Sequence, residues 1–505
     1  MNTLLIVGCI VVYFGLLYLI SWITGKEADE ASYFRGNRSS PWYVVAFGMI
    51  GASLSGVTFI SVPGWVGTSQ FSYLQMVLGY LLGYVVIAQV LIPLYYRENL
   101  TSIYGYLGRR FGPAAYRTGA GFFLVSRVIG ASFRLFLVAL VFRLLLQKLG
   151  LSVPFFVPVL VSICLIFVYT LKGGIKTVVW TDTLQTACLL LAALLTVVWI
   201  AGRLDLDVAS FVTLVRDSEL TRVWVWDWGA ANHLVKHVIS GAFIAIVMTG
   251  LDQDMMQKNL TCRTAAESQK NVYSFCVILV FANVLFLCLG FLLYQYGLAE
   301  KLVMLDSAGA SPLSILDRAT GDWVARGTDE LYPILAMDYL GGMVMVTFTL
   351  GLIAAAYSSA DSALTALTTS FCVDFLGFES GKRSESDRER TRKGVQLGFA
   401  LLLFGTILLF ERINDQSVIS AIFKVAGYTY GPILGLFALG LFSRLEVSDS
   451  RVPWVCVAAP VLTYVADTNL GRWIDFEFGF LVLPLNGLLT IVGLWLIRRP
   501  PLSQT

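Results

Sequence analysis

Small hydroxyl side chains surround one acid in the middle of an apolar stretch that is long enough to cross a lipid bilayer. The stretch runs over 347–374 and reads TFTLGLIAAAYSSADSALTALTTSFCVD. Four of its polar residues fall on one face of a helix: Ser358, Asp361, Ser362 and Thr365. An acid at membrane depth is costly and usually faces a partner or a wet cavity. Short oxygen ligands beside an acid suit a hard cation such as sodium, whereas a small-residue packing seam is the alternative.

Two further apolar stretches carry helix-weakening residues at their centres. The first, over 43–68, contains GMIGASLSGVTFISVPGWVG, and the second, over 235–257, contains Gly250 two residues before Asp252. Glycine and proline weaken or break a helix, and unwound backbone at membrane depth survives only where it lines protein or a cavity. Such a pair of interrupted helices favours an inverted-repeat transporter. Ordinary glycine-rich helix packing is the alternative.

Two arginines, Arg127 and Arg134, lie seven positions apart and so on one face of the fourth expected helix. An arginine in mid-membrane is strongly disfavoured unless it faces a cavity or a counter-ion. The counter-ion could be an acid of the protein: Asp182, Asp252 or Asp361. Otherwise the guanidinium could hold the carboxylate of a solute through a two-pronged contact. We expect Asp252 to be the nearest partner of Arg134 in the empty protein.

Composition indicates a polytopic membrane protein. The chain has 505 residues, of which 57% are hydrophobic and 14% charged, and soluble chains carry about 25% charged residues. Eight cysteines without CxxC spacing and two histidines argue against a disulfide framework or a zinc site. No nucleophile–base set or nucleotide motif indicates an enzyme. The mixed charge run over 376–393 indicates a solvated loop without a nucleic-acid role.

Apolar runs of about 20 residues predict an all-α protein with thirteen transmembrane helices, near 3–23, 43–68, 73–96, 117–146, 154–171, 177–201, 235–257, 271–297, 336–372, 394–410, 416–442, 452–467 and 477–497. With the N-terminus outside and the C-terminus inside, every inner loop carries at least two basic residues, Lys258 among them. The predicted organisation is a leading helix and inner loop (1–41), a first five-helix repeat (42–202), an outer loop (203–234), a second inverted repeat (235–442) and two trailing helices with a short inner tail (443–505).

Six segments together resemble the sodium/solute symporter family. They are YFRGNRSSPWYVVAFGMIGASLSG, LTSIYGYLGRRFG, KGGIKTVVWTDTLQ, DQDMMQKNL, AAAYSSADSALTALTTSFCVDF and AGYTYGPILGLFALGLF. The resemblance covers nearly the whole chain. It implies a main sodium site at Gly51, Leu54, Ala355, Ser358 and Ser359. A second site, which some members have, would use Asp182, Ser358, Asp361 and Ser362, although Asp361 stands where such members carry Ser or Thr.

The resemblance also implies a solute pocket, with candidate residues Ser53, Ser55, Thr58, Gln75, Arg134 and Asp252. Sugar carriers of the family have Gln at the position of Thr58 and Asn at that of Asp252, which disfavours a plain hexose. Sialic acid carriers hold the solute carboxylate with an arginine close to the position of Arg134. The expected function is therefore sodium-coupled symport of a small carboxylate-bearing solute, such as sialic acid, by alternating access.

Two alternatives stay open: a sodium-coupled carrier of a neutral sugar or polyol, and a membrane sensor or channel-like protein that reuses the fold. The expected location is the plasma (inner) membrane of the cell. The expected partners are sodium, an anionic solute and the lipid bilayer, without an obligate protein partner.

Overall fold

The computed structural model describes residues 3–26, 30–148, 150–171, 173–305, 313–318, 320–378, 384–413, 418–474 and 478–499. Part of the predicted loop 376–393 and the predicted tail beyond residue 499 lie outside the described residues. The helices of the first half are α1 (Thr3–Thr24), α2 (Glu30–Arg35), α3 (Trp42–Ser53), α4 (Gly56–Ser69), α5 (Tyr73–Val86), α6 (Ile92–Arg97), α7 (Gly105–Arg110), α8 (Pro113–Lys148), α9 (Phe156–Thr170), α10 (Gly174–Arg203) and α11 (Val208–Asp217). Those of the second half are α12 (Leu234–Ala245), α13 (Gln253–Asn259), α14 (Ala265–Ala299), α15 (Leu331–Ile334), α16 (Gly342–Ser370), α17 (Glu385–Ile413), α18 (Val418–Thr429), α19 (Gly431–Phe442), α20 (Val452–Ile474) and α21 (Val482–Leu496).

The helices are apolar enough for a membrane protein with several spans. Within the described ranges, seven helices are long and apolar enough to cross a bilayer, or up to ten if each of three bent pairs counts as one span. Two shorter apolar helices add to these, over Gly8–Thr24 and Phe156–Thr170. The expected helical, polytopic architecture is therefore confirmed. The number thirteen and the repeat boundaries stay predictions.

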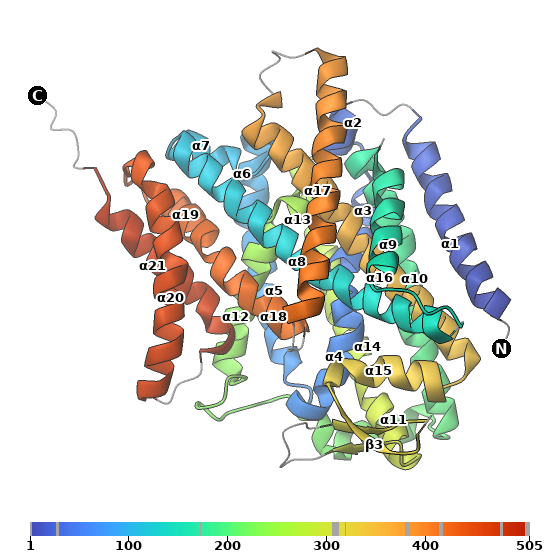
Figure 1. Cartoon of the computed structure of the whole chain (residues 1–505). Coiled ribbons are helices and arrows are strands. Elements are labelled where there is room, and N and C mark those ends of the chain that lie inside the picture. Colours follow the sequence, from blue (N-terminus) through green and yellow to red (C-terminus); the bar gives the residue numbers. More distant parts are fainter. Residues whose placement is uncertain are drawn as a thin grey trace, which may run out of the picture.

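A small sheet corrects the all-α expectation. Strands β1 (Val303–Leu305), β2 (Leu313–Leu316) and β3 (Trp323–Arg326) form an antiparallel sheet in the order β1-β2-β3. Val303 pairs with Ile315, and Leu313 pairs with Arg326. Figure 1 shows the sheet and α11 together at one end of the helical body, with α7 near the other end. The strands were not predicted because each has only three or four residues, too few to show an alternating pattern.

The centre of the protein is built by helices from both predicted repeats. Helix α10 packs against α3 and α16, and α12 packs against α5. Two glycines allow α5 and α12 to approach closely. A Cβ atom at Gly79 would overlap the Val238 carbonyl oxygen, and one at Gly241 would overlap the Met76 carbonyl oxygen. Small residues at such a crossing let two helix backbones touch, as in other membrane bundles.

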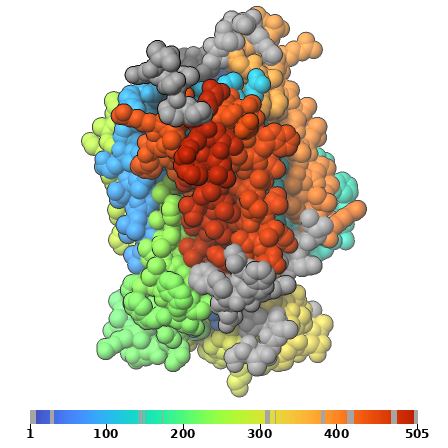
Figure 2. All heavy atoms as spheres, turned by 90° about the vertical axis from the view of Figure 1, so that its left-hand side faces the viewer, coloured from blue at the N-terminus to red at the C-terminus, as the bar shows by residue number. Residues whose placement is uncertain are grey.

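The trailing helices form an outer layer. Figure 2 shows α20 and α21, in red, over the centre of one side of the molecule. Large apolar side chains on this layer are exposed, with relative accessibilities of 76% for Trp454, 58% for Val461 and 57% for Leu488. Lipid chains can cover such a surface, because they are as apolar as these side chains.

Candidate functional site

The first predicted interruption lies between α3 and α4, whose axes differ by 59°. Helix α3 ends at Ser53, and Leu54 has φ −86° and ψ 68°, outside the helical region. The Leu54 N–H still donates to the Ile50 carbonyl at 2.7 Å, so the helical bonding ends only there. Since the last carbonyls of a helix lack intrahelical partners, the peptide oxygens of this break are suited to bind a cation.

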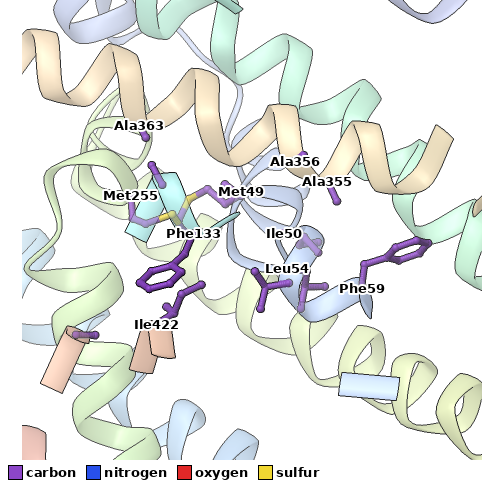
Figure 3. Close-up of a cluster of buried hydrophobic side chains, with 14 of the residues drawn as sticks. Met49, Ile50, Leu54, Phe59, Phe133, Met255, Ala355, Ala356, Ala363 and Ile422 are labelled. Carbon is purple, nitrogen blue, oxygen red and sulfur yellow. The ribbon is translucent and has the colours of Figure 1, made fainter. Parts of the chain in front are cut away.

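Helix α16 passes this break with its hydroxyl-bearing face toward Gly51. A Cβ atom at Gly51 would lie 3.3 Å from Ser358 Oγ. Ser359 Oγ donates to the Ala355 carbonyl at 3.3 Å, and Figure 3 shows Ala355 on α16 across from Leu54. Gly51 and Ser358 therefore meet where α16 packs against α3, Leu54 ends α3, and Ala355 and Ser359 lie within one turn of Ser358 on α16.

The space beside Gly51 leads to a first prediction. A Cβ atom here would overlap Thr186 Oγ1, which accepts a hydrogen bond from the Gly51 N–H at 2.9 Å. We expect Gly51→Ala to weaken sodium affinity at least tenfold, because α3 must move away from α10 and α16; overpacking of this kind costs about 1–3 kcal/mol. Sodium titration by thermal shift measures the change. Gly130→Ala is the matched control, since nothing lies within 4 Å of a Cβ at that position. Equal sodium affinity in both variants would contradict the assignment of Gly51.

Asp182 of α10 lies directly behind this contact and is fully buried. Its Oδ1 accepts a hydrogen bond from Ser358 Oγ at 2.6 Å. Its Oδ2 lies 2.7 Å from Lys258 Nζ, and the two side chains are 0% and 1% exposed. The sequence predicts that Lys258 lies in an inner loop. The structure corrects this, because Lys258 lies in α13, the shorter helix of the second bent pair, which bends by 68°, and its side chain is buried.

Asp361, on the same face of α16, is held by its own set of donors. Its Oδ2 accepts from Tyr169 Oη at 2.7 Å and from Thr181 Oγ1 at 3.5 Å. Its Oδ1 accepts from the Ser362 N–H at 2.6 Å. Among the described residues, the buried hydroxyls of Ser362 and Thr365 have no hydrogen-bond partner. The residues predicted for a second cation site therefore lie close together, but an ammonium group already contacts one of the two carboxylates.

A cavity opens on the other side of the break. It is lined by Ser53, Leu54, Ser55 and Thr58 of the break and α4, by Tyr73, Tyr80 and Tyr84 of α5, by Arg127 and Arg134 of α8, and by Thr249, Met255, Asn283, Ile422 and Phe423 among others. Figure 3 shows three of the lining residues, Met255, Ile422 and Leu54. The walls thus combine aromatic rings with hydroxyl, amide and guanidinium donors, as solute pockets do. The predicted residues Ser53, Ser55, Thr58 and Arg134 all line it.

The two arginines of α8 have different surroundings. Arg127 forms a buried ion pair with Asp254, and its Nη1 lies 3.8 Å from Asp252 Oδ2. Arg134 is 8% exposed and makes no ion pair within the described ranges; its Nε lacks a hydrogen-bond partner there. Asp252 is the one acid whose charge acts on Arg134 among the described residues, but its salt bridge is with Arg127.

Two predicted pocket residues do not line the cavity. Asp252 caps α13 by accepting from the N–H groups of Asp254 and Met255 at 2.9 and 3.2 Å, and it also accepts from Tyr430 Oη. Gln75 donates to the Asn232 carbonyl at 3.0 Å and accepts from the Val225 N–H at 3.1 Å. The polar atoms of both side chains are occupied in fixing local backbone, so neither is available to a solute in this conformation.

Several site residues were missed from the sequence, among them Thr186, Lys258, Tyr430 and Asn283. Thr186 lies one helical turn beyond Asp182, so the i, i+4 spacing on α10 was the available signal. The lysine follows directly on the polar run of the second break. No comparable signal marked Tyr430 or Asn283, because single polar residues are common in apolar helices that pack on one another.

Comparison with known proteins places this geometry in context. The model described as "Sodium:solute symporter family" matches residues 33–446. The sodium/sialic acid symporter NanT of Aliivibrio fischeri is 24% identical over 475 residues, which cover 92% of this chain and 88% of that protein. The sodium/glucose cotransporter of Vibrio parahaemolyticus is 25% identical over 464 residues, covering 87% and 80% of the two chains.

A solved structure has the same fold along the whole chain. It is described as the substrate-bound, outward-open state of a Na⁺-coupled sialic acid symporter with a novel Na⁺ site. The two structures agree with a TM-score of 0.79 over 97% of each chain, at 19% sequence identity. This likeness shows the fold.

Proposed function

The chain belongs to the sodium:solute symporter family, and we propose that it carries a small carboxylate-bearing solute, such as a sialic acid, into the cell together with sodium. NanT of Aliivibrio fischeri, similar over most of its length, is a sodium/sialic acid symporter. Family membership makes sodium the co-transported ion. The nature of the solute depends on the cavity.

The observation that carries the proposal is the environment of Arg134. This guanidinium lies in a membrane-spanning helix, is 8% exposed, and lines the cavity without an acidic partner among the described residues. A charged arginine in such a place is costly unless something compensates it. Arg127, seven residues earlier on α8, shows the compensated case, because Asp254 neutralises it. A solute carboxylate would give Arg134 the same partner through a two-pronged contact.

We further propose that sodium binds at the break through Gly51, Leu54, Ala355, Ser358 and Ser359. Sodium is a hard cation that prefers uncharged and charged oxygens over nitrogen or sulfur. Two observations support the location: the Gly51 backbone faces Ser358, and the helical bonding of α3 ends at Leu54. Ser53 and Ser55 flank Leu54 and line the solute cavity. Ion and solute would thus act on the same few peptide units, which provides a direct route for coupling.

The alternative is a neutral sugar or polyol as the solute. The similarity to the sodium/glucose cotransporter favours it, and so do the hydroxyl groups of Ser55, Thr58 and three tyrosines in the cavity. A neutral solute would leave Arg134 uncompensated, so we favour the acid. A sensor or channel-like protein is the alternative from another class; it would show no solute accumulation against a gradient.

A thermal-shift screen of the purified protein tests the solute class. The panel contains N-acetylneuraminic acid, simple monocarboxylates and neutral hexoses, each with sodium and with choline in its place. A ligand that binds the folded state raises the unfolding temperature. We expect a carboxylate to raise it in sodium and much less in choline. Stabilisation by a hexose alone would overturn the choice of an acidic solute, and accumulation absent from proteoliposomes would favour the sensor.

The proposed orientation follows the basic loops. We propose a multi-pass protein of the plasma membrane with the N-terminus outside and the C-terminus inside, on the strength of the predicted loop charges. The sheet and α11 lie at one end of the molecule, with α7 and its Arg109 and Arg110 near the other. This separation supports an outer end that carries the sheet.

Ser359 provides a test of the sodium site that leaves the fold in place. Within the described ranges its hydroxyl bonds to the carbonyl of Ala355 on its own helix and to no other group, so its removal should cost about 1 kcal/mol of stability. We expect Ser359→Ala to abolish most sodium-dependent uptake. Thr349→Val is the matched control, because it removes a hydroxyl that likewise bonds to its own helix, at the Met345 carbonyl. Unchanged sodium affinity in Ser359→Ala would show that the site lies elsewhere.

A further inference from the structure

The ammonium group of a lysine lies among the oxygen atoms of the predicted second cation site. Lys258 Nζ lies 2.7 Å from Asp182 Oδ2, and both side chains are fully enclosed. The lysine comes from α13 in the second predicted repeat, whereas Asp182 belongs to α10 in the first. A positive charge from one repeat therefore neutralises an acid of the other within the protein.

The neighbouring oxygens leave little for a free ion to bind. Asp182 Oδ1 accepts from Ser358, and both oxygens of Asp361 accept from Tyr169, Thr181 and the Ser362 N–H. Among the described residues, the hydroxyls of Ser362 and Thr365 lack a hydrogen-bond partner, and Asp182 Oδ2 has its ion pair with Lys258. Two neutral hydroxyls are a poor set for a sodium ion that must also lie near an ammonium group, because like charges repel strongly in a low-dielectric interior.

The same contacts give Asp182 a different task. Ser358 donates its single hydroxyl hydrogen to Asp182 Oδ1 at 2.6 Å. A hydroxyl has one hydrogen and two lone pairs, so this bond turns the hydrogen away and leaves a lone pair free on the side of Gly51. Asp182 thus presents Ser358 as a ligand to the main sodium site, and Lys258 fixes the carboxylate that does so.

We propose that Lys258 is a built-in cation that takes the place of a second sodium ion, so that one sodium accompanies each solute. Asp182 and Lys258 act as positioning residues for the main site. The proposal rests on the proposed sodium coupling for its stoichiometry. The occupancy of the Asp182 site by the ammonium group does not depend on it, and the two parts are tested separately.

The first experiment measures the pair without sodium. The full-length protein is purified in choline chloride, and unfolding temperatures are compared for the wild type, Asp182→Asn, Lys258→Gln and the double variant. Removing one partner leaves a buried charge uncompensated. We expect the unfolding temperature to fall further in each single variant than in the double variant. Alternatively, a single variant fails to fold where the double variant folds. If the decrease in unfolding temperature of the double variant equals the sum of the decreases of the two single variants, the proposal is overturned, whatever the protein transports.

The second experiment counts sodium ions. Tracer fluxes of sodium and solute into proteoliposomes give their ratio, which we expect to be one for the wild type. In Lys258→Gln the vacated oxygens can take an ion, so the Hill coefficient for sodium should rise from about 1 toward about 2. Lys393→Gln is the matched control, since Lys393 is exposed and forms a salt bridge with Glu389 on its own helix. A wild-type ratio of two would overturn the proposal. Sodium-independent uptake by the wild type would instead refute the proposed function. The unfolding measurement in choline would still show whether the Lys258 ammonium group occupies the Asp182 site.

Discussion

Arg134→Lys should raise the apparent KM for a carboxylate solute at least tenfold, a loss of about 1.4 kcal/mol. The lysine keeps the charge, but it cannot form the two parallel hydrogen bonds of a guanidinium. Sodium affinity in the absence of solute should change much less, because Arg134 lies on α8 and the proposed sodium ligands lie on α3, on α16 and at Leu54 in the break. Uptake of labelled solute over a range of concentrations, together with sodium titration by thermal shift, separates the two effects.

Arg143→Lys is the matched control on the same helix. Arg143 pairs with Glu411 near the surface, where the two side chains are 36% and 37% exposed. Exposed pairs of this kind contribute little, so neither KM nor stability should change. If Arg134→Lys has an ordinary KM for the carboxylate, the guanidinium does not hold the solute and the argument for an acidic solute fails.

Arg127→Met should destabilise the protein by about 3–5 kcal/mol, the usual effect of removing one partner of a buried ion pair. The loss would come from Asp254, which is 0% exposed and would keep its charge without a partner. The nearby Asp252, 3.8 Å from the Arg127 guanidinium, would add to the loss. Thermal unfolding in detergent, or the yield of monodisperse protein, measures this effect.

The double variant Arg127→Met with Asp254→Asn removes both charges of this pair. It should recover most of the lost stability, since a buried pair replaced by neutral groups of similar size is often close to neutral in stability. A double variant no more stable than Arg127→Met would show that Arg127 stabilises the protein through its packing. Solute uptake by the double variant then reports whether Arg127 also touches the solute.

The sequence predicted the parts of the site whose signals are local. The hydroxyl face of the 347–374 stretch follows from helical periodicity, and the structure places Ser358 against Gly51 as expected. The interruption after Gly51 follows from glycine content, and the two halves bend by 59° there. In both cases the residues that define the feature lie within a few turns of each other.

The predictions that the structure corrects concern contacts between segments that are far apart in the sequence. Arg127 and Arg134 lie on the same face of α8, and nothing local decides which of them meets the acids of the second break. The sequence predicts a loop at Lys258 because the residues after the break are polar. The 68° bend that returns it to the interior depends on packing of α13 against α16 and α3. The prediction that Gln75 lines the pocket was wrong for the same reason, since its hydrogen-bond partners lie in a loop about 150 residues away.

The Lys258–Asp182 pair has a consequence for how much solute the cell could gather. A charge crossing 100 mV of membrane potential releases about 2.3 kcal/mol, but one sodium and one singly charged anion carry no net charge when they cross together. Lys258 stays in the protein and adds none to the cargo. The voltage would then do no net work, and a tenfold sodium gradient, about 1.4 kcal/mol, would sustain only about tenfold accumulation of the anion. In exchange, uptake would continue in a cell whose membrane has lost its potential.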